Sequence, residues 1–473
     1  SSAASDVYKR QMYIFVPVFK IQVMRINSLY YKQNINIAFP IMLSLAGQAI
    51  VQMADNIMVG QLGAPELAAV SLAGAIIMNT MVVGMGIATG LTPLVGQAHA
   101  LDDKERIAGF FQNSLLLNTT VSLVLTLFLF MLMPYLSMMG QPAEVVELCK
   151  GYYILTSFSV IPFILFMTFK QYMEGIGNTK VAMVITISCN LMNIFLNYIF
   201  IYGKFGAPFL GVAGAGLATL ISRLMMPIAF FLYIHRSQIY SPVFRFFQFS
   251  NTSRRKIKQL LQVGYPIAGQ MVVEFLSLSL ITVMMGWLGT IALAANQIVM
   301  SMISLTFMIS SGIAGASTIL VSHEFGRGNI GKMRRYAHAS LRLAVIFMAG
   351  AAVIYALFGA PIASIFTPDP DVIKVARNLF FVVAVFEIFD GLQVTALGAL
   401  RGITDVQRPM IYALVSYLFV AVPLAYIAGI LLDFGAPGLL SGFCGGLMFA
   451  ATLFIRRFNK SVRNIRQRRV TNL

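Results

Sequence analysis

The sequence predicts an all-α integral membrane protein of about twelve transmembrane helices in two six-helix lobes. Of its 473 residues, 58% are hydrophobic and only 11% are charged, whereas soluble domains carry about 25% charged residues. Apolar runs of about 20 residues recur along the chain, and this length lets a helix cross roughly 30 Å of hydrocarbon. The runs are continuous, which favours helices over the alternating strands of a barrel. An internal duplication divides the runs into two sets.

The expected membrane spans follow one another with short connections. Several are longer than the minimum, which permits tilt but fixes no angle. Pro40 and Pro266 are expected to bend the first helix of each half, because neighbouring helices can satisfy the backbone groups that a proline frees. The expected limits are 35–60, 67–97, 107–134, 151–173, 181–202, 210–234, 258–288, 292–324, 335–359, 374–399, 409–432 and 437–456.

Lysine and arginine fall in alternate connections between these spans. They occur near 104–106, 180, 236–258, 327–335, 401–408 and 456–469. The connections containing "GQPAEVVEL", "GKFGAPFLG" and "FTPDPDV" are poor in basic residues. The positive-inside rule therefore predicts that the basic connections and both termini are cytoplasmic. The formal net charge of +17 is mainly this orientation signal, so no nucleic-acid partner is expected.

The two halves of the chain repeat one another in sequence. "MVGQLG" at 58–63 recurs as "MMGWLG" at 284–289, and "GIATGLTPLV" at 86–95 recurs as "GIAGASTILV" at 312–321, both at an offset of 226 residues. "EGIGNTKVAM" at 174–183 matches "RGITDVQRPM" at 401–410 at an offset of 227. A period this long indicates duplication of a whole bundle. Two halves that each hold six spans are parallel repeats, with a cavity expected at their interface.

The repeat and the basic connections set the expected domain boundaries. We expect an N-terminal leader at 1–33, an N-lobe at 34–234, a basic cytoplasmic linker at 235–257, a C-lobe at 258–456 and a basic cytoplasmic tail at 457–473. Residues 1–11, "SSAASDVYKRQ", resemble the translated end of a sequencing transposon and are set aside. Met12 and Met24 are alternative starts.

Three carboxylates lie inside apolar stretches: Asp55, Glu274 and Asp390. A charge at the centre of a bilayer costs roughly 2.5–3.5 kcal/mol on insertion scales, so such residues usually face a cavity that serves ions or substrates. The repeat offset places none of them opposite another acid. Because a carboxylate needed only to build the bundle should often occur in both copies, this favours function. A structural, hydrogen-bonded carboxylate is the competing interpretation.

Other polar residues could support these carboxylates. Glu387 precedes Asp390 by three residues, so it lies on a neighbouring part of the same helix face, either within the site or as a stabilising partner. Asn190, Asn193 and Asn197 form one stripe of the fifth span. Amide oxygens suit a small hard cation, so Asn193 and Asn197 could complete a pocket with Asp55. Interhelical hydrogen bonding explains them equally well and is favoured for Asn190.

The ordered blocks "MVGQLGAPELAAVSL", "MMGWLGTIALAANQI", "GLTPLVGQAHALDD" and "GALRGITD" resemble those of the multidrug and toxic compound extrusion (MATE) family across residues 34–457. The acids of the first, seventh and tenth spans are similar to those of its NorM-like branch. The resemblance implies exchange of organic cations for Na⁺ or H⁺, with Na⁺ at Asp55 or at Glu274 and Asp390. The DinF-like branch carries an acid in the fifth span, where this chain has Asn197 in "NIFLNY".

The expected protein is a monomeric efflux transporter of a bacterial cytoplasmic membrane, with the lipid bilayer and small organic cations as its partners. The alternative is a flippase for a lipid-linked saccharide or another amphipathic metabolite, although flippases of the same wider superfamily commonly line the cavity with basic residues and the mid-membrane charges expected here are acidic. A non-transporting scaffold or receptor would not need three such acids. No Walker lysine, metal-ligand spacing or nucleophile-base set is evident, so ATP, cofactors and enzymatic activity are not expected.

Overall fold

The computed structural model describes residues 28–247 and 252–471, and these form helices and turns without a strand. The start of the expected leader, with Met12, Met24 and residues 1–11, lies outside the described residues, as does the centre of the basic linker. Eleven helical segments are long and apolar enough to cross a membrane. They are Ser28–Gly60, Ala64–His99, Lys104–Met138, Ala143–Gly175, Thr179–Tyr202, Gly211–Arg236, Arg254–Trp287, Thr290–Gly326, Ile330–Phe366, Gln407–Leu431 and Gly435–Arg468. The all-α membrane fold is confirmed.

Helix α14, Pro370–Gly402, supplies the remaining expected span. It is 33 residues long, contains Glu387 and Asp390, and packs among α12 (Thr290–Gly326), α13 (Ile330–Phe366) and α17 (Gly435–Thr471). Each expected span therefore corresponds to one helical segment. The last one differs in extent, because α17 continues as helix through most of the expected tail.

Helix starts repeat between the two halves. Asp103 precedes α5 (Lys104–Leu132) and accepts a hydrogen bond from the Arg106 amide. Asn329, at the same offset of 226 in the second half, precedes α13 and accepts from the Lys332 amide. Each side chain satisfies one of the amides that a helix start leaves without an intrahelical partner. The duplicated sequence thus fixes duplicated helix boundaries.

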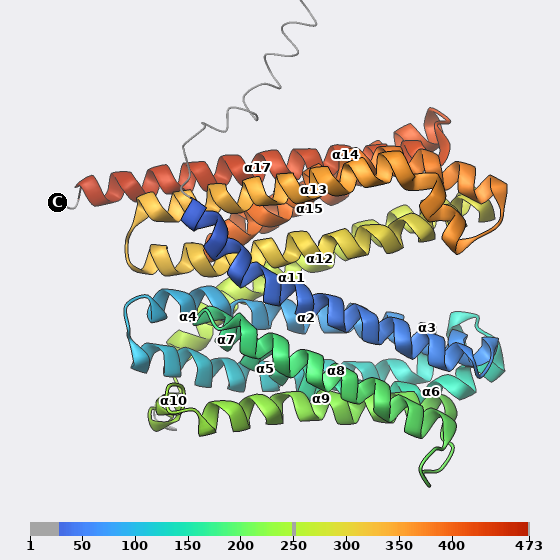
Figure 1. Cartoon of the computed structure of the whole chain (residues 1–473), viewed down its shortest axis with the longest axis horizontal. Coiled ribbons are helices and arrows are strands. Elements are labelled where there is room, and N and C mark those ends of the chain that lie inside the picture. Colours follow the sequence, from blue (N-terminus) through green and yellow to red (C-terminus); the bar gives the residue numbers. More distant parts are fainter. Residues whose placement is uncertain (1–27, 248–251, 472–473) are drawn as a thin grey trace, which may run out of the picture.

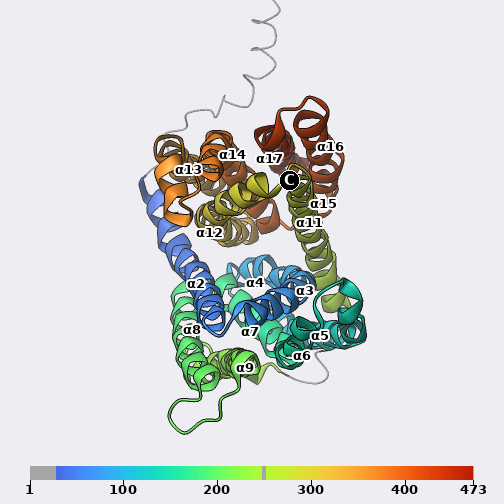
Figure 2. The same cartoon turned by 90° about the vertical axis from the view of Figure 1, so that its right-hand side faces the viewer.

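The helices form two bundles that two long helices connect (Figure 1). The first bundle contains α3 (Ala64–Thr89), α4 (Leu91–His99), α5, α6 (Ala143–Phe158), α7 (Val160–Gly175), α8 (Thr179–Tyr202) and α9 (Gly211–Arg236). The second contains α12, α13, α14, α17 and the span Gln407–Leu431. Helices α2 (Ser28–Gly60) and α11 (Arg254–Trp287) run from one bundle to the other along opposite sides (Figure 2).

The two bundles meet at one end, which we call the linker end: the end where α2 and α11 begin and where α4, α12 and α14 finish. A Cβ on Gly90, the residue between α3 and α4, would lie 2.8 Å from the Gly264 amide nitrogen of α11. At the corresponding crossing of α2 and α12, Ala38 and Ala316 share one buried cluster. Small residues let helix backbones approach closely in membranes. Each half of the repeat therefore contributes one close crossing to the same junction.

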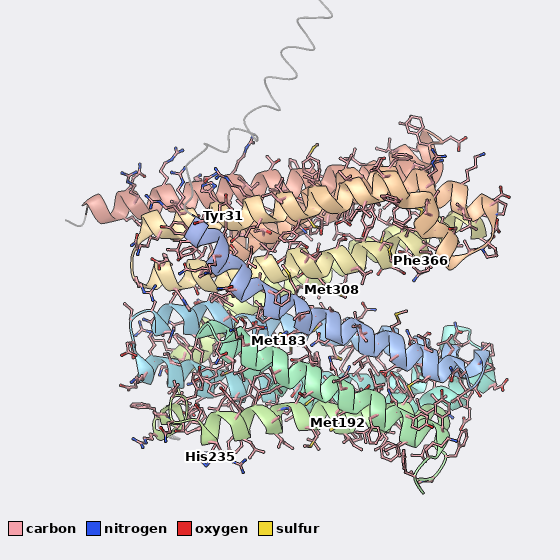
Figure 3. All side chains as sticks on the ribbon, viewed as in Figure 1. Tyr31, Met183, Met192, His235, Met308 and Phe366 are labelled. Carbon is pink, nitrogen blue, oxygen red and sulfur yellow. The ribbon has the colours of Figure 1, made fainter. Side chains whose placement is uncertain are left out.

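The beginning of α2 packs on the second bundle although its sequence belongs to the first repeat. Tyr30 contacts the Tyr336 ring edge-on, with centroids 4.8 Å apart. Tyr31 lies at this start of α2 (Figure 3), and its hydroxyl accepts a hydrogen bond from Arg342. Ser340 donates to the Asn34 side-chain oxygen over 2.5 Å. Helix α2 thus joins the second bundle at the linker end and the first bundle at the far end.

Candidate functional site

In the first bundle the structure brings together Asp55, Asn193 and Asn197. Asn197 on α8 donates from its side-chain amide to Asp55 on α2, and the same amide lies 3.1 Å from the Asn193 side-chain oxygen. Both asparagines are buried, and Asp55 is partly exposed. The remaining oxygen of Asn197 is buried without a hydrogen-bond partner. Three side chains thus present oxygens at one place between α2 and α8, and the bond from Asn197 to Asp55 is also the interhelical hydrogen bond that the alternative interpretation expects.

Arg223 is not among the residues predicted from sequence, and it corrects the expectation that mid-membrane charges are acidic. It lies near the middle of α9. Its guanidinium donates to the Ser159 hydroxyl over 2.8 Å, lies 4.9 Å from the centroid of the Phe163 ring and interacts electrostatically with Asp55. Because α9 is apolar on either side of it, Arg223 carried the same signal as the acids, namely a lone charge inside a span.

In the second bundle Glu274 and Asp390 lie close enough for their charges to interact. Glu274 comes from α11, whereas Asp390 comes from α14. Gln393 donates to Asp390 over 3.3 Å, and the Tyr417 hydroxyl donates to Gln393 over 2.8 Å. One carboxylate oxygen of Asp390 is buried and has no hydrogen-bond partner. The two predicted acids therefore lie in one polar cluster, which we call the C-terminal site and in which one buried carboxylate oxygen has no hydrogen-bond partner.

Tyr417 reaches the C-terminal site from an irregular part of its span. Residues Val415–Ala421 form π-helix, and so do residues Ile427–Leu431. Short π-helical stretches, in which the backbone bonds run from i to i+5, are rare and frequently occur at functional sites. Local sequence does not reveal such a stretch, so Tyr417 was not among the predicted site residues.

Glu387 lies beside Asp390 but is bonded to a different helix. It is fully buried, and it accepts a hydrogen bond from Thr306 of α12 over 2.8 Å. Its second carboxylate oxygen is also buried without a partner. Glu387 interacts electrostatically with Asp390. It is thus both anchored to α12 and close to the site, so the geometry accommodates each of the two predicted roles.

A further basic residue reaches the C-terminal site from the linker end. Arg401, in the last turn of α14, donates from Nη2 to the Gln270 side-chain oxygen over 2.9 Å. The Gln270 amide nitrogen lies 3.4 Å from a carboxylate oxygen of Glu274. From sequence, Arg401 is one of the basic residues that indicate orientation. The structure turns its side chain toward the site.

The remaining predicted residues, Pro40, Pro266 and Asn190, lie within helices. Pro40 lies inside α2 and Pro266 lies inside α11, the two helices that cross between the bundles. Asn190 is buried, and its amide nitrogen has no hydrogen-bond partner.

Among the described residues no group of three or more His, Cys, Asp or Glu side chains is arranged to hold a metal ion. A cation at either site would therefore rely on amide and hydroxyl oxygens as well as on carboxylates.

Comparison with known proteins identifies the family. The MatE family model matches residues 40–199 and 266–427. A probable multidrug resistance protein NorM from Rhizobium meliloti is 30% identical over 441 residues, which cover 92% of this chain and 94% of the relative. A multidrug resistance protein NorM from Photobacterium profundum is 29% identical, covering 90% and 94% of the two chains.

Solved structures support the same fold. An outward-facing multidrug resistance MATE family transporter superposes with a TM-score of 0.83 at 21% identity, covering 93% of this chain and 97% of the other. A MOP superfamily transporter from Pyrococcus furiosus, described as having a binding pocket of reversed polarity, also has a TM-score of 0.83 at 21% identity, covering 92% and 97%. From its two matched halves and its similarity to the NorM proteins, this chain is a NorM-like member of the MatE family.

Proposed function

We propose that this protein exports organic cations in exchange for Na⁺ or H⁺ by alternating access of its two lobes. The carrying observation is the C-terminal site, where Glu274 and Asp390 lie together and Asp390 keeps an unpartnered carboxylate oxygen in a helical membrane protein. Carboxylates attract a cation of either kind, so an organic cation and a coupling ion compete for the same charge. The multidrug resistance names of the relatives support the substrate class.

The membrane potential supplies the driving force. An ion that enters a negative cytoplasm gains about 2.3 kcal/mol per charge per 100 mV, in addition to its concentration gradient. Glu274 and Asp390 would hold the organic cation or the coupling ion, and Asp55 with Asn193 and Asn197 would bind a cation in the first lobe. Coupling requires that the entering ion releases the substrate from the carboxylates.

The closed linker end fits one state of this cycle. The basic connections predict that the linker end faces the cytoplasm, and the close contacts between the bundles occur there. We therefore assign the described arrangement to an outward-facing state, in which the carboxylates are reached from outside. Both termini are proposed to be cytoplasmic, and the membrane to be the bacterial inner membrane.

The second candidate function is a flippase for a lipid-linked saccharide. Arg223 is the observation in its favour, because a basic residue could hold the phosphate of such a lipid. Its guanidinium, however, already donates to Ser159, lies over the Phe163 ring and interacts electrostatically with Asp55. The C-terminal site contains three carboxyl groups and one arginine. This balance suits a cationic substrate better than an anionic one.

The experiment is ethidium efflux from bacteria that lack their own efflux pumps and express the full chain, with Na⁺ and H⁺ gradients imposed separately. Efflux that one gradient accelerates would support the proposal and identify the coupling ion. Correctly inserted protein that gives no efflux under either gradient would contradict cation export and favour the flippase. The same cells without the chain provide the background rate.

A further inference from the structure

Arg401 stands out because its charge is turned inward at a helix end where arginine usually faces outward. An arginine in the last turn of a helix commonly stabilises the helix dipole or contacts lipid headgroups. The Arg401 side chain instead crosses to α11 and donates to Gln270 over 2.9 Å. Its Nε is buried and has no hydrogen-bond partner. A buried donor of this kind requires an explanation beyond helix capping.

Gln270 connects Arg401 to Glu274 in the C-terminal site. It lies one helical turn before Glu274 on α11, so the two side chains share a face. Its oxygen accepts from Arg401, and its nitrogen lies 3.4 Å from the Glu274 carboxylate. Guanidinium, amide and carboxylate are therefore aligned donor to acceptor, in an order that polarises each bond in the same sense. The charges of Arg401 and Glu274 also interact directly through space.

The repeat shows that the fold does not require arginine at this position. At the offset of 227, the residue that corresponds to Arg401 is Glu174, at the end of α7. Glu174 is buried, and its carboxylate lies 3.8 Å from Lys170 of the same helix. One half of the molecule thus has an acid paired within its own helix where the other half has a base that reaches a different helix. An arginine at this position therefore occurs only in the half that contains the C-terminal site with Glu274 and Asp390.

We propose that Arg401 acts as a resident cation: through Gln270 it neutralises Glu274 when the site holds neither coupling ion nor substrate, and it competes with both for that carboxylate. The inference rests on the proposed function and deepens it. Leaving a buried charge unpaired is costly, and an exchanger must pass through a state in which one cation has left before the next arrives. Arg401 is a positioning residue in this scheme, because it acts through Glu274.

Competition by a resident charge predicts a separation of binding from turnover. Without Arg401, Glu274 would bind an entering cation more tightly, because no neighbouring positive charge opposes it. The same cation would also leave more slowly. Arg401 and Glu274 are separated by the Gln270 side chain. At the effective dielectric constant of partly buried sites, removing one charge at this separation changes the affinity of Glu274 for a cation by about tenfold. A structural role for Arg401 predicts no such gain in affinity.

The test measures ethidium binding by fluorescence with the purified full chain in lipid nanodiscs, and ethidium efflux in cells. Arg401→Gln should lower both the Kd and the efflux KM for ethidium by about five- to tenfold and should also lower the maximal rate. Arg401→Lys, which keeps the charge, should restore values close to those of the original chain. An unchanged or higher Kd in folded Arg401→Gln protein, or Lys behaving like Gln, would overturn the inference.

Arg457→Gln is the matched control. Arg457 lies at the same end of the second bundle and pairs with Asp405 over 2.7 Å, and neither residue contacts the carboxylate site. This variant removes one positive charge and should leave the Kd for ethidium unchanged. An equal gain in affinity in Arg457→Gln would show a general charge effect and would overturn the role of Arg401.

If Arg401→Gln fails to fold, Gln270→Met interrupts the same connection while it keeps the guanidinium. It should lower the Kd for ethidium in the same direction, and an unchanged or higher Kd would contradict the inference. Failure of the proposed function is distinguishable, because the original chain would then neither bind nor export ethidium. If the original chain does both and the Arg401 variants show no gain in affinity, only the resident-cation inference fails.

Discussion

The side-chain amide of Gln97, in the first half of the chain, donates a hydrogen bond over 3.1 Å to the main-chain oxygen of Gly402, in the second half. The repeat produces a matching contact. His323, at an offset of 226 from Gln97, lies with its Nε2 2.8 Å from the oxygen of Gly175, and Gly175 corresponds to Gly402 at an offset of 227. Two symmetry-related bonds therefore join the bundles at the linker end. We call this pair of bonds the latch.

His323→Gln tests the latch by copying its other half. Glutamine should keep a donor near the Gly175 oxygen, so transport should stay within about twofold of the original rate. His323→Ala removes the donor, and membrane hydrogen bonds contribute roughly 0.6 kcal/mol on average. This loss should shift the conformational equilibrium toward opening of the linker end about threefold. Labelling of a cysteine placed at Ser322, which is buried against Gly96 at the linker end, by a membrane-permeant thiol reagent measures the opening, and equal labelling of both variants would argue against the latch.

Gly90→Ala tests the close crossing of α3 and α11. The new Cβ would lie 2.8 Å from the Gly264 nitrogen, and this backbone contact cannot move aside as a side chain could. Overpacking typically costs about 1–3 kcal/mol, so the closed linker end should be destabilised and efflux should fall by at least tenfold. Gly74→Ala within α3 is the control, because a Cβ there meets nothing within 4 Å. Similar efflux from the two variants would show that this crossing does not matter.

A disulfide between Asn34→Cys and Ser340→Cys should stop transport. The two side chains are in contact at 2.5 Å between α2 and α13, across the junction that alternating access must open. Oxidation should therefore hold the linker end closed and abolish ethidium efflux, and reduction should restore it. The single Ser340→Cys variant, treated with the same oxidant, separates cross-linking from loss of the hydrogen bond. If the cross-linked protein exports ethidium as fast as the chemically reduced protein, transport does not require opening at this junction.

Asn197→Ala should weaken coupling-ion binding in the first lobe. Asn197 donates to Asp55 and contacts Asn193, so its removal takes away a proposed ligand oxygen and the hydrogen-bond partner of the carboxylate. The ion concentration for half-maximal efflux should rise about tenfold, equivalent to roughly 1.4 kcal/mol. Asn118→Ala is matched in burial, but Asn118 bonds Thr168 and Ser114 elsewhere in the lobe. An equal rise in both variants would indicate general loss of packing rather than ion binding.

Much of the fold follows from sequence because it depends on length and periodicity. Each expected span matches a helical segment, since a helix that crosses a bilayer needs a continuous apolar run. The repeat also predicted two related halves. It did not predict that α2 and α11 cross between the bundles, because the offset relates the sequences of the two halves and does not say which helices pack together.

The sequence singled out Asp55, Glu274 and Asp390 because each interrupts an apolar run, and the structure places Asp55 beside Asn197 and Glu274 near Asp390. Arg223 carried the same signal and was overlooked, whereas Arg401 could not be recognised. A basic residue at a helix end has the same local sequence whether its side chain turns toward lipid headgroups or toward Gln270. Tyr417 reaches Gln393 from a π-helical segment that no local pattern indicates. Contacts of this kind depend on tertiary packing.

The most direct test of cation-coupled exchange uses purified protein in sealed liposomes, with an Na⁺ or an H⁺ gradient imposed in turn and ethidium transport followed by fluorescence. One gradient should drive transport by the original chain. Asp390→Asn removes the carboxylate that has an unpartnered oxygen. It should lower the rate of driven transport at least a hundredfold, while the protein inserts into the membrane and unfolds at the same temperature as the original chain. Driven transport by Asp390→Asn at the original rate would contradict the proposed exchange at this carboxylate.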